Sequence, residues 1–184
     1  MPFVGPGSTK TPADGSVDTA QLVDAAVTDP KVADGAVVQV VNVMDGEVAT
    51  GTTTTPSDNS IPQNTEGTEV MTLAITPKST TNKLKIEVVV QASHSGTNGV
   101  MVTALHQDST ANALAAVVQQ QSLGTAHNVM SFTHYMAAGT VSETTFKVRL
   151  GGTAGTISFN GQSSARILGG VSASSITITE IKAS

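Results

Sequence analysis

Four histidines are the residues of this chain best suited to acid–base or metal chemistry: His94, His106, His127 and His134. None of them is followed by a second histidine or an acid at a metal-ligand spacing such as His-Glu-x-x-His. Convergence in the fold, or three copies of one histidine on a threefold axis, would be needed to assemble a ligand set. A surface or core position is the simpler interpretation for each histidine, so we expect no metal site.

Other catalytic signatures are incomplete. The segment GGTAG (151–155) lacks the Lys and Ser/Thr of a phosphate-binding loop, and Ser163 and Ser164 stand outside any Gly-x-Ser-x-Gly elbow. A polysaccharide-cleaving enzyme needs a specific pair of carboxylates at the scissile bond, whereas the acids after residue 48 are dispersed. We therefore expect no enzyme activity, no catalytic residue and no cofactor.

Glu180 is the acid with two competing interpretations. It lies within the terminal alternating segment SSITITEI (174–181). It could point inward as a partner for Arg149 or Arg166, or it could simply be exposed on a sheet edge. The sequence pattern leaves both interpretations open, with edge exposure the simpler of the two.

The net charge of −5 is concentrated at the start of the chain. Residues 1–47 hold seven acids and two bases, and residues 48–184 hold seven of each, which leaves the rest of the chain neutral. We expect no nucleic-acid binding, because it needs clustered Lys and Arg. The acidic segment could dock onto a basic protein surface, or its aspartates could serve only solubility.

Composition excludes two further classes. The chain has no cysteine, so disulfide and thiolate-metal frameworks are impossible. No apolar run approaches twenty residues, and the first fifteen residues lack a basic start followed by an apolar stretch. We therefore expect neither membrane insertion nor a signal peptide.

The sequence predicts short strands as the elements that would position a functional site. KLKIEVVVQAS (83–93) alternates, with Leu84, Ile86, Val88 and Val90 on one face. Similar segments cover 38–44, 68–77, 99–108, 127–138, 144–152, 155–161 and 174–183, separated by Gly, Asn and Pro. Residues 113–121 could be helix or strand, and 163–171 a short strand or a loop. This pattern predicts an all-β protein with an antiparallel, jelly-roll-like β-sandwich knob.

A ten-residue repeat precedes the strands. Its large apolar residues fall at every fifth position: Val17, Leu22, Val27, Val32 and Val37. This spacing fits neither a helix nor a strand, but it suits an extended arm whose apolar positions meet copies of themselves on a threefold axis. We therefore predict an extended arm (1–36) that anchors and trimerises the protein and a knob (37–184). The alternative is a disordered linker with an accidental period.

Several segments resemble those of a known group of proteins. TAQLVDAAVTDPKVADGAV resembles the decapeptide repeats of bacteriophage fibre proteins, and SIPQNTEGTEVMTLAITPKSTTNKLKI (60–86) with SSITITEI (174–181) resembles a β-rich domain of phage fibre-like proteins. The resemblance implies a homotrimeric structural protein on the outer surface of the virion.

A position on the virion follows from the short arm. The repeat begins within fifteen residues of Met1, which leaves no room for a tail-attachment domain if the chain is complete. We therefore expect a capsid decoration, cement or head-fibre protein that binds the major capsid protein or another virion protein. The alternative is a tail-fibre receptor-binding module for a host surface glycan, for which His134 and Tyr135 are the densest candidate recognition residues.

Overall fold

The computed structural model describes residues 32–183. Asp34 begins a compact unit that continues to the end of the chain. Three of the expected trimer contacts, Val17, Leu22 and Val27, lie outside the described residues. The arm assignment and its boundary after residue 36 therefore stay predictions.

The compact unit consists of strands and one short 3-10 turn. The strands form in the segments of the sequence that are rich in β-branched residues or alternate in polarity, since such side chains pack well on a pleated surface. The elements are β1 (Val37–Asp45), β2 (Ala49–Gly51), β3 (Thr68–Ile75), β4 (Lys83–His94), β5 (Val100–Gln107), β6 (Ala115–Gln120), β7 (His127–Ala137), β8 (Thr144–Gly152), β9 (Ile157–Phe159), β10 (Gly161–Gln162), β11 (Ala165–Arg166), the turn η3 (Leu168–Gly170) and β12 (Ser174–Ile181).

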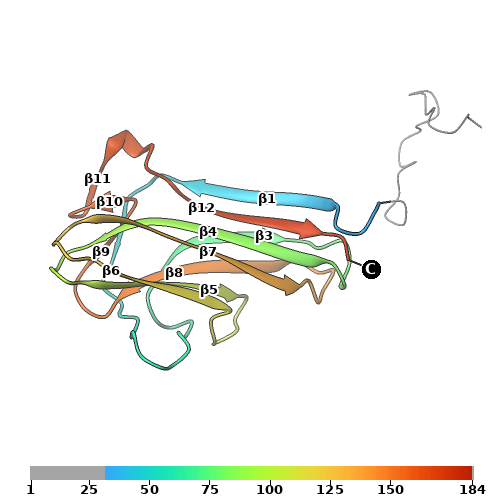
Figure 1. Ribbon diagram of the computed structural model, residues 1–184, viewed down its shortest axis with the longest axis horizontal. Helices are drawn as coiled ribbons and strands as arrows, with labels where there is room; N and C mark the ends of the chain where they lie inside the picture. The colour runs from blue at the N-terminus through green and yellow to red at the C-terminus, as the bar shows by residue number, and fades with distance from the viewer. Residues whose placement is uncertain (1–31, 184) are drawn as a thin grey trace, which may run out of the picture. The chain divides into compact units, whose positions relative to one another are not determined.

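Eight long strands form two facing antiparallel sheets (Figure 1). One sheet has the order β1-β12-β4-β7, with β9 and β2 extending it at one end of β4, and the other has the order β3-β8-β5-β6. From β3 onward, consecutive long strands mostly alternate between the sheets, which is the pairing pattern of a jelly roll. The predicted all-β antiparallel sandwich is confirmed. No helix in residues 32–183 could cross a membrane.

Two ambiguous segments are resolved by their neighbours. Residues 115–120 form β6, because pairing with β5 and packing of Val117 on the core override the helix preference of alanine. Residues 163–171 contain the two-residue strand β11 and then η3. Local propensity is therefore a weaker determinant here than sheet pairing.

The core lies between the two sheets and follows the predicted alternation. Leu84, Ile86, Val88 and Val90 of β4 are all buried, and β8 contributes Phe146 from the facing sheet. Most of the other buried apolar side chains are Val, Ile, Met or Ala. Because few large rings fill this layer, the polar groups that enter it must be hydrogen-bonded if the sandwich is to be stable.

Glu180 is the main polar group in this layer, and it is 0% exposed. Its carboxylate accepts hydrogen bonds from Gln39 Nε2 (2.6 Å), Asn82 Nδ2 (2.6 Å) and the backbone N–H of Lys78 (2.8 Å). It thereby joins β12 to β1 and to the turn before β4. Glu180 thus points inward, but not toward either expected partner.

The two arginines bind elsewhere. Arg149 donates to the carbonyl oxygens of Glu66 and Gly67, at 2.8 Å each, and lies 3.5 Å from the carboxylate of Glu69. Arg166 forms an ion pair with Glu47 near η3. The simpler interpretation of Glu180 as an exposed edge residue is therefore wrong, because the pleat of β12 directs it into the sandwich.

We predict that Glu180→Gln lowers the free energy of unfolding by about 1–3 kcal/mol. The three donors now bond to two carboxylate oxygens, whereas an amide group would offer them one acceptor oxygen. Urea unfolding at pH 7.5 measures this change. Glu143→Gln is the matched control, since Glu143 is exposed in the β7–β8 loop and should change stability by less than about 0.5 kcal/mol. Equal unfolding free energies for the two variants would contradict the role assigned to Glu180.

Candidate interaction surface

The outer face of the β1-β12-β4-β7 sheet is the most continuous exposed surface formed by paired strands. Register places its residues in rows, because directly paired residues point to the same side of a sheet. The rows are Val40–Thr179–Lys85–Tyr135, Asn42–Thr177–Glu87–Thr133 and Met44–Ser175–Val89–Ser131, followed by the pair Gln91–Val129. We call these residues the open face.

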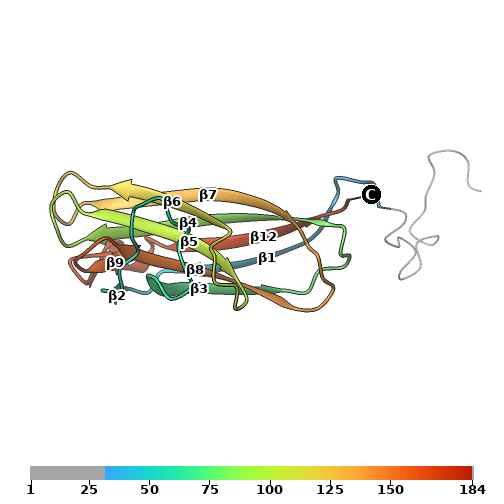
Figure 2. The ribbon, with the colours of Figure 1, turned by 90° about the horizontal axis from the view of Figure 1, so that it is seen from below.

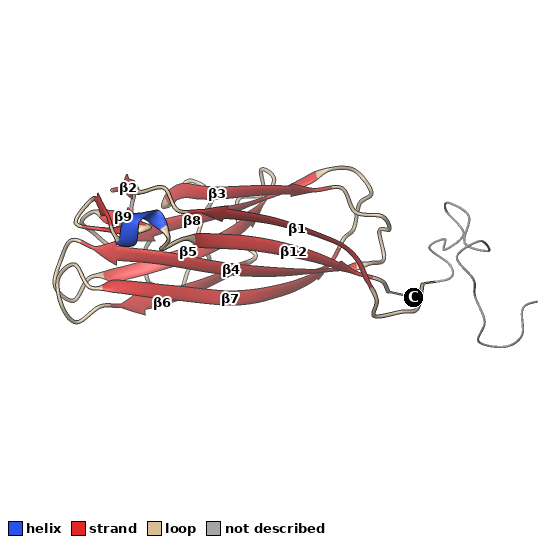
Figure 3. Cartoon of the chain, turned by 90° about the horizontal axis from the view of Figure 1, so that it is seen from above, coloured by secondary structure: helices blue, strands red, loops and turns tan. Residues whose placement is uncertain are grey.

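Large apolar side chains stand exposed on the open face. Met44 is 70% exposed, Val129 59%, Tyr135 57% and Val40 55%. Figure 3 looks onto this side of the unit and shows no described segment crossing the four strands. Exposed apolar side chains gathered on one sheet face are typical of a surface that another protein covers.

The open face carries almost no net charge. Its only two charged residues, Lys85 and Glu87, form an ion pair of 2.9 Å. The hydrogen bond to Glu87 is the main cause that raises the pKa of Lys85. Hydroxyl and amide side chains fill most of the remaining positions. Two copies of this face could therefore approach each other without strong like-charge repulsion.

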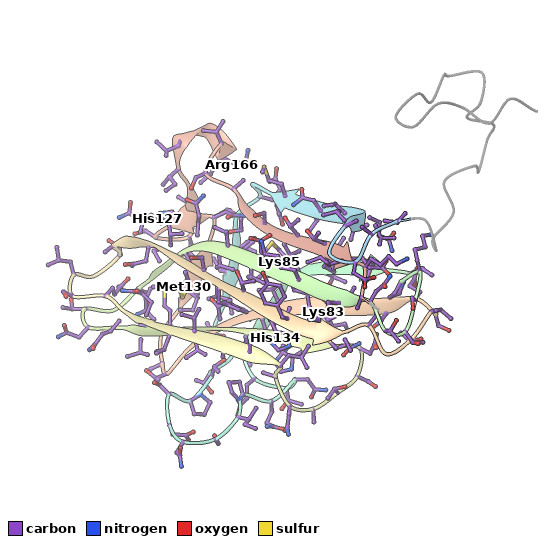
Figure 4. All side chains as sticks on the ribbon, turned by 45° about the vertical axis from the view of Figure 1, so that its right-hand side comes forward. Lys83, Lys85, His127, Met130, His134 and Arg166 are labelled. Atoms are coloured by element: carbon purple, nitrogen blue, oxygen red, sulfur yellow. The ribbon has the colours of Figure 1, made fainter. Side chains whose placement is uncertain are left out.

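A shallow hollow of about 330 Å³ lies at one end of the open face. Tyr135, Lys83 and Thr81 line it together with Met136 and Ala137. Figure 4 shows Lys83 farther from Arg166 than Lys85. A side chain of a partner could fill this hollow beside the exposed ring of Tyr135.

The other sheet differs, because residues 52–66 cross its outer face (Figure 2). We call this segment the strap. It is held at one end by the hydrogen bond from Thr55 N to Gly152 O (2.9 Å) and at the other by Asn64 N to Ala111 O (2.7 Å). The outward-facing Val102 and Ala104 of β5 are buried there. Within residues 32–183, no comparable segment covers the open face.

His94 is a structural residue at the tip formed by the β4–β5 and β8–β9 loops. Its Nδ1 accepts from the N–H of Gly96 (2.9 Å), so Nε2 carries the proton and donates to the carbonyl oxygen of Ala154 (2.5 Å). A side chain at Gly99 would put a Cβ 2.1 Å from Nδ1, so only glycine fits there. Both ring nitrogens are engaged with backbone groups, which leaves neither available as a catalytic base.

His106 lies on the outer face of β5, next to the strap, and is 1% exposed. Neither ring nitrogen has a hydrogen-bond partner among the described residues. Burial lowers the pKa of His106, and the charge of Arg149 lowers it further, while Glu66 and the backbone of Thr110 act in the opposite direction. The Thr110 backbone lies near the ring without meeting hydrogen-bond geometry.

The last two histidines are partly buried. Burial is the cause that lowers the pKa of both His127 and His134. Both lie on β7, and Figure 4 shows them well separated along that strand. The four histidines therefore do not assemble into one site, and no group of three His, Cys, Asp or Glu residues within 32–183 could hold a metal ion.

The residues proposed from sequence for surface recognition face opposite sides of β7. Tyr135 stands on the open face, whereas His134 lies half-buried on the side of Met130 and Phe132. They cannot form one recognition pair, since neighbouring residues of a strand alternate in direction. Their recognition role stays a prediction. Of the expected arm contacts, Val32 is half-buried and Val37 is exposed.

The open face itself was missed by the sequence reasoning. Each strand shows an alternating pattern, and this pattern identifies an outward set such as Lys85, Glu87 and Val89. The exposed apolar residues belong to β1 and β7, however, and the two strands become neighbours of one sheet only through β12 and β4. Strand pairing was the missing information.

The family model for the Pgp3 C-terminal domain of Chlamydia matches residues 37–184. No curated protein sequence matches the chain. The family match overturns the resemblance to bacteriophage fibre proteins. The expected virion structural role, as capsid decoration, head fibre or tail-fibre receptor-binding module, is therefore corrected, and so is the location on a phage particle. The segments 60–86 and 174–181 that carried part of the resemblance lie within the matched residues, whereas nearly all of the repeat precedes them.

Solved structures with similar strand arrangements are distant. A structure of infectious bursal disease virus (Gt strain) has 11% identity and a TM-score of 0.40, covering 85% of this chain and 42% of that one. Latent PorU from Porphyromonas gingivalis has 8% identity and a TM-score of 0.38, covering 82% and 14%. The enzymatically active domain of tailspike protein 4 from bacteriophage CBA120 has 13% identity and a TM-score of 0.27, covering 66% and 18%. The chain thus spans less than half the length of each of these proteins.

We predict that acid lowers the stability of the protein. The pKa values of His106, His127 and His134 lie below the usual 6.5 in the folded state, so the unfolded chain binds more protons once the pH falls below about 6.5. Stability is therefore fully present above that pH and is lost as the pH falls. Urea unfolding at pH 7.5 and 5.5 should show a lower free energy at pH 5.5.

The histidines on β7 provide the control. Replacing both His127 and His134 by Phe removes two of the three titrating groups, so the difference in unfolding free energy between pH 7.5 and 5.5 should shrink. A difference that is unchanged in the double variant would show that other groups cause the acid sensitivity.

Proposed function

The chain belongs to the family of the Pgp3 C-terminal domain of Chlamydia, and on this premise we propose that residues 37–184 form a non-catalytic binding module that assembles as a homotrimer through its open face. The observation that carries the proposal is the difference between the two outer sheet faces. One is covered by the strap, and the other exposes Val40, Met44, Val129 and Tyr135 without a cover.

The chemistry of the open face supports association with copies of itself. Its exposed apolar side chains would gain by burial at about 25 cal/mol per Å². The Lys85–Glu87 pair is already neutralised within each copy, so no unpaired charge of this face would be buried. The thin core of the sandwich adds to the argument, because a domain with few large buried side chains gains stability when an interface covers more apolar area.

The sequence that runs into β1 supports a threefold state. The apolar period of residues 17–37 suits identical chains around one axis, and β1 continues directly from this repeat and forms one edge of the sheet with the open face. In a closed cyclic assembly, every copy would contact its neighbours through the open face.

The placement of the candidate catalytic groups supports a role in binding. His94 is engaged with backbone groups through both ring nitrogens, and His106 is enclosed beside the strap. Glu180 is enclosed in the core, where it holds three hydrogen-bond donors. None of these groups is in a position to reach an external substrate.

We predict that Val129→Asp weakens the assembly while Val141→Asp does not. The two valines have nearly equal exposure, 59% and 55%, but Val129 lies on the open face and Val141 in the β7–β8 loop. An aspartate buried without a partner should cost about 2 kcal/mol for each of the three copies, which amounts to about 6 kcal/mol or on the order of 10^4-fold in the overall dissociation constant of the trimer. Sedimentation measured at micromolar concentration gives this value.

Wild-type protein should sediment at three times the 18.6 kDa chain mass, as should Val141→Asp. Unfolding curves confirm that both variants keep their fold. A monomeric or dimeric wild-type protein would refute the trimer, and equal association of the two variants would refute the open face as its interface.

A further inference from the structure

The strap is fastened to the sheet by several separate contacts near its second half. Asn64 bonds to the turn after β5 through its backbone N–H and through its side chain, which donates to the carbonyl oxygen of Ser109 (3.1 Å). Gln63 donates to Asn112 (3.0 Å), and its own backbone N–H donates to Glu66 Oε2 (2.9 Å). Arg149 of β8 then holds the last strap carbonyl, that of Glu66. This part of the strap is thus held by polar contacts.

His106 is the one enclosed titratable side chain next to these contacts. Its strand partner in β8 is Lys147, and Arg149 of the same strand adds a second positive charge. The acids around it are Glu66 from the strap, Glu69 from β3, which pairs with both cations, and Asp108 from the following turn. Asp108 is already bound to Thr144 and Thr145. No charged residue faces it from β6.

A proton on His106 would disturb this arrangement. The imidazolium would carry two N–H donors, and among residues 32–183 neither ring nitrogen has an acceptor in hydrogen-bond geometry. It would also place a third positive charge beside Lys147 and Arg149 in a site that excludes water. A buried charge without a partner is costly, and the ring could reach water most directly if the nearby strap moved aside.

We propose that the strap is an acid-sensitive cover, which stays closed while His106 is neutral and opens when His106 binds a proton. Opening uncovers the apolar strip of Val102 and Ala104, next to Ala116 and Val118 of β6. A hollow of about 210 Å³ already separates the strap residues Pro56 and Pro62 from this strip. The middle of the strap is therefore only loosely packed, so its release depends mainly on the contacts near His106.

Hydrogen–deuterium exchange of the full-length protein tests the proposal. Exchange is measured at pH 7.5 and 5.5 and corrected for the intrinsic pH dependence of amide exchange. If the open strap gives His106 its usual pKa of 6.5, the opening equilibrium should rise about tenfold between the two pH values. Peptides from residues 52–66 should then lose about tenfold in protection, whereas β4 peptides (83–94) should stay at the higher protection that global unfolding sets.

Three variants test whether protonation of His106 causes the strap to open. His106→Phe and His106→Gln cannot bind the proton, so their strap protection should not change with pH, and the second variant serves if the first does not fold. His134→Phe is the matched control, because it removes a partly buried histidine of β7 and should leave the acid opening intact. The proposal is wrong if wild-type strap protection is independent of pH. It is equally wrong if the strap peptides are as well protected as the β4 peptides at pH 5.5, because the strap would then open only with global unfolding, or if the loss persists in either His106 variant.

Discussion

The structure depends on a shared apolar layer that two antiparallel sheets bury between them with few large side chains. Such a layer tolerates polar groups only when their hydrogen bonds are made internally. Glu180 meets this condition at one end, where its carboxylate joins β12 to β1 and to the turn before β4. Gln121 meets it near the other end, where its side chain bonds to the backbone of His94 and Gly96. These buried contacts fix the strand ends on which both outer faces are built.

The outer faces of the two sheets differ in what covers them. The strap covers one and buries Val102 and Ala104, whereas the open face keeps exposed apolar side chains in rows with a single internal ion pair. This asymmetry is the basis of both proposals. The strap is proposed as a movable cover of the first face, and the open face is proposed as the trimer contact. His106 belongs to the covered face, so its protonation would act on the strap without touching the proposed trimer contacts.

The correction of the family assignment also has a structural reason. The repeat and the short strand segments that resembled phage fibre proteins reflect a composition of Thr, Val, Gly and Asp that many β-rich proteins share. A sandwich of this kind hosts many unrelated functions, so its strands do not identify the biological setting. The match over residues 37–184 identifies the family, which is that of the Pgp3 C-terminal domain.

The sequence by itself determined the strands and their inward faces. Leu84, Ile86, Val88 and Val90 alternate with polar residues, and a period of two permits only a strand with one buried side. Tertiary structure alone decided which strands are neighbours, because pairing joins residues far apart in the chain, as in Val40 with Thr179. That pairing turned Glu180 toward Asn82 rather than an arginine and placed His106 beside the strap. It also gathered Val129 and Tyr135 with Val40 and Met44 on one face. No local pattern encodes these contacts, since each depends on the register of strands that the sequence separates by up to about 140 residues.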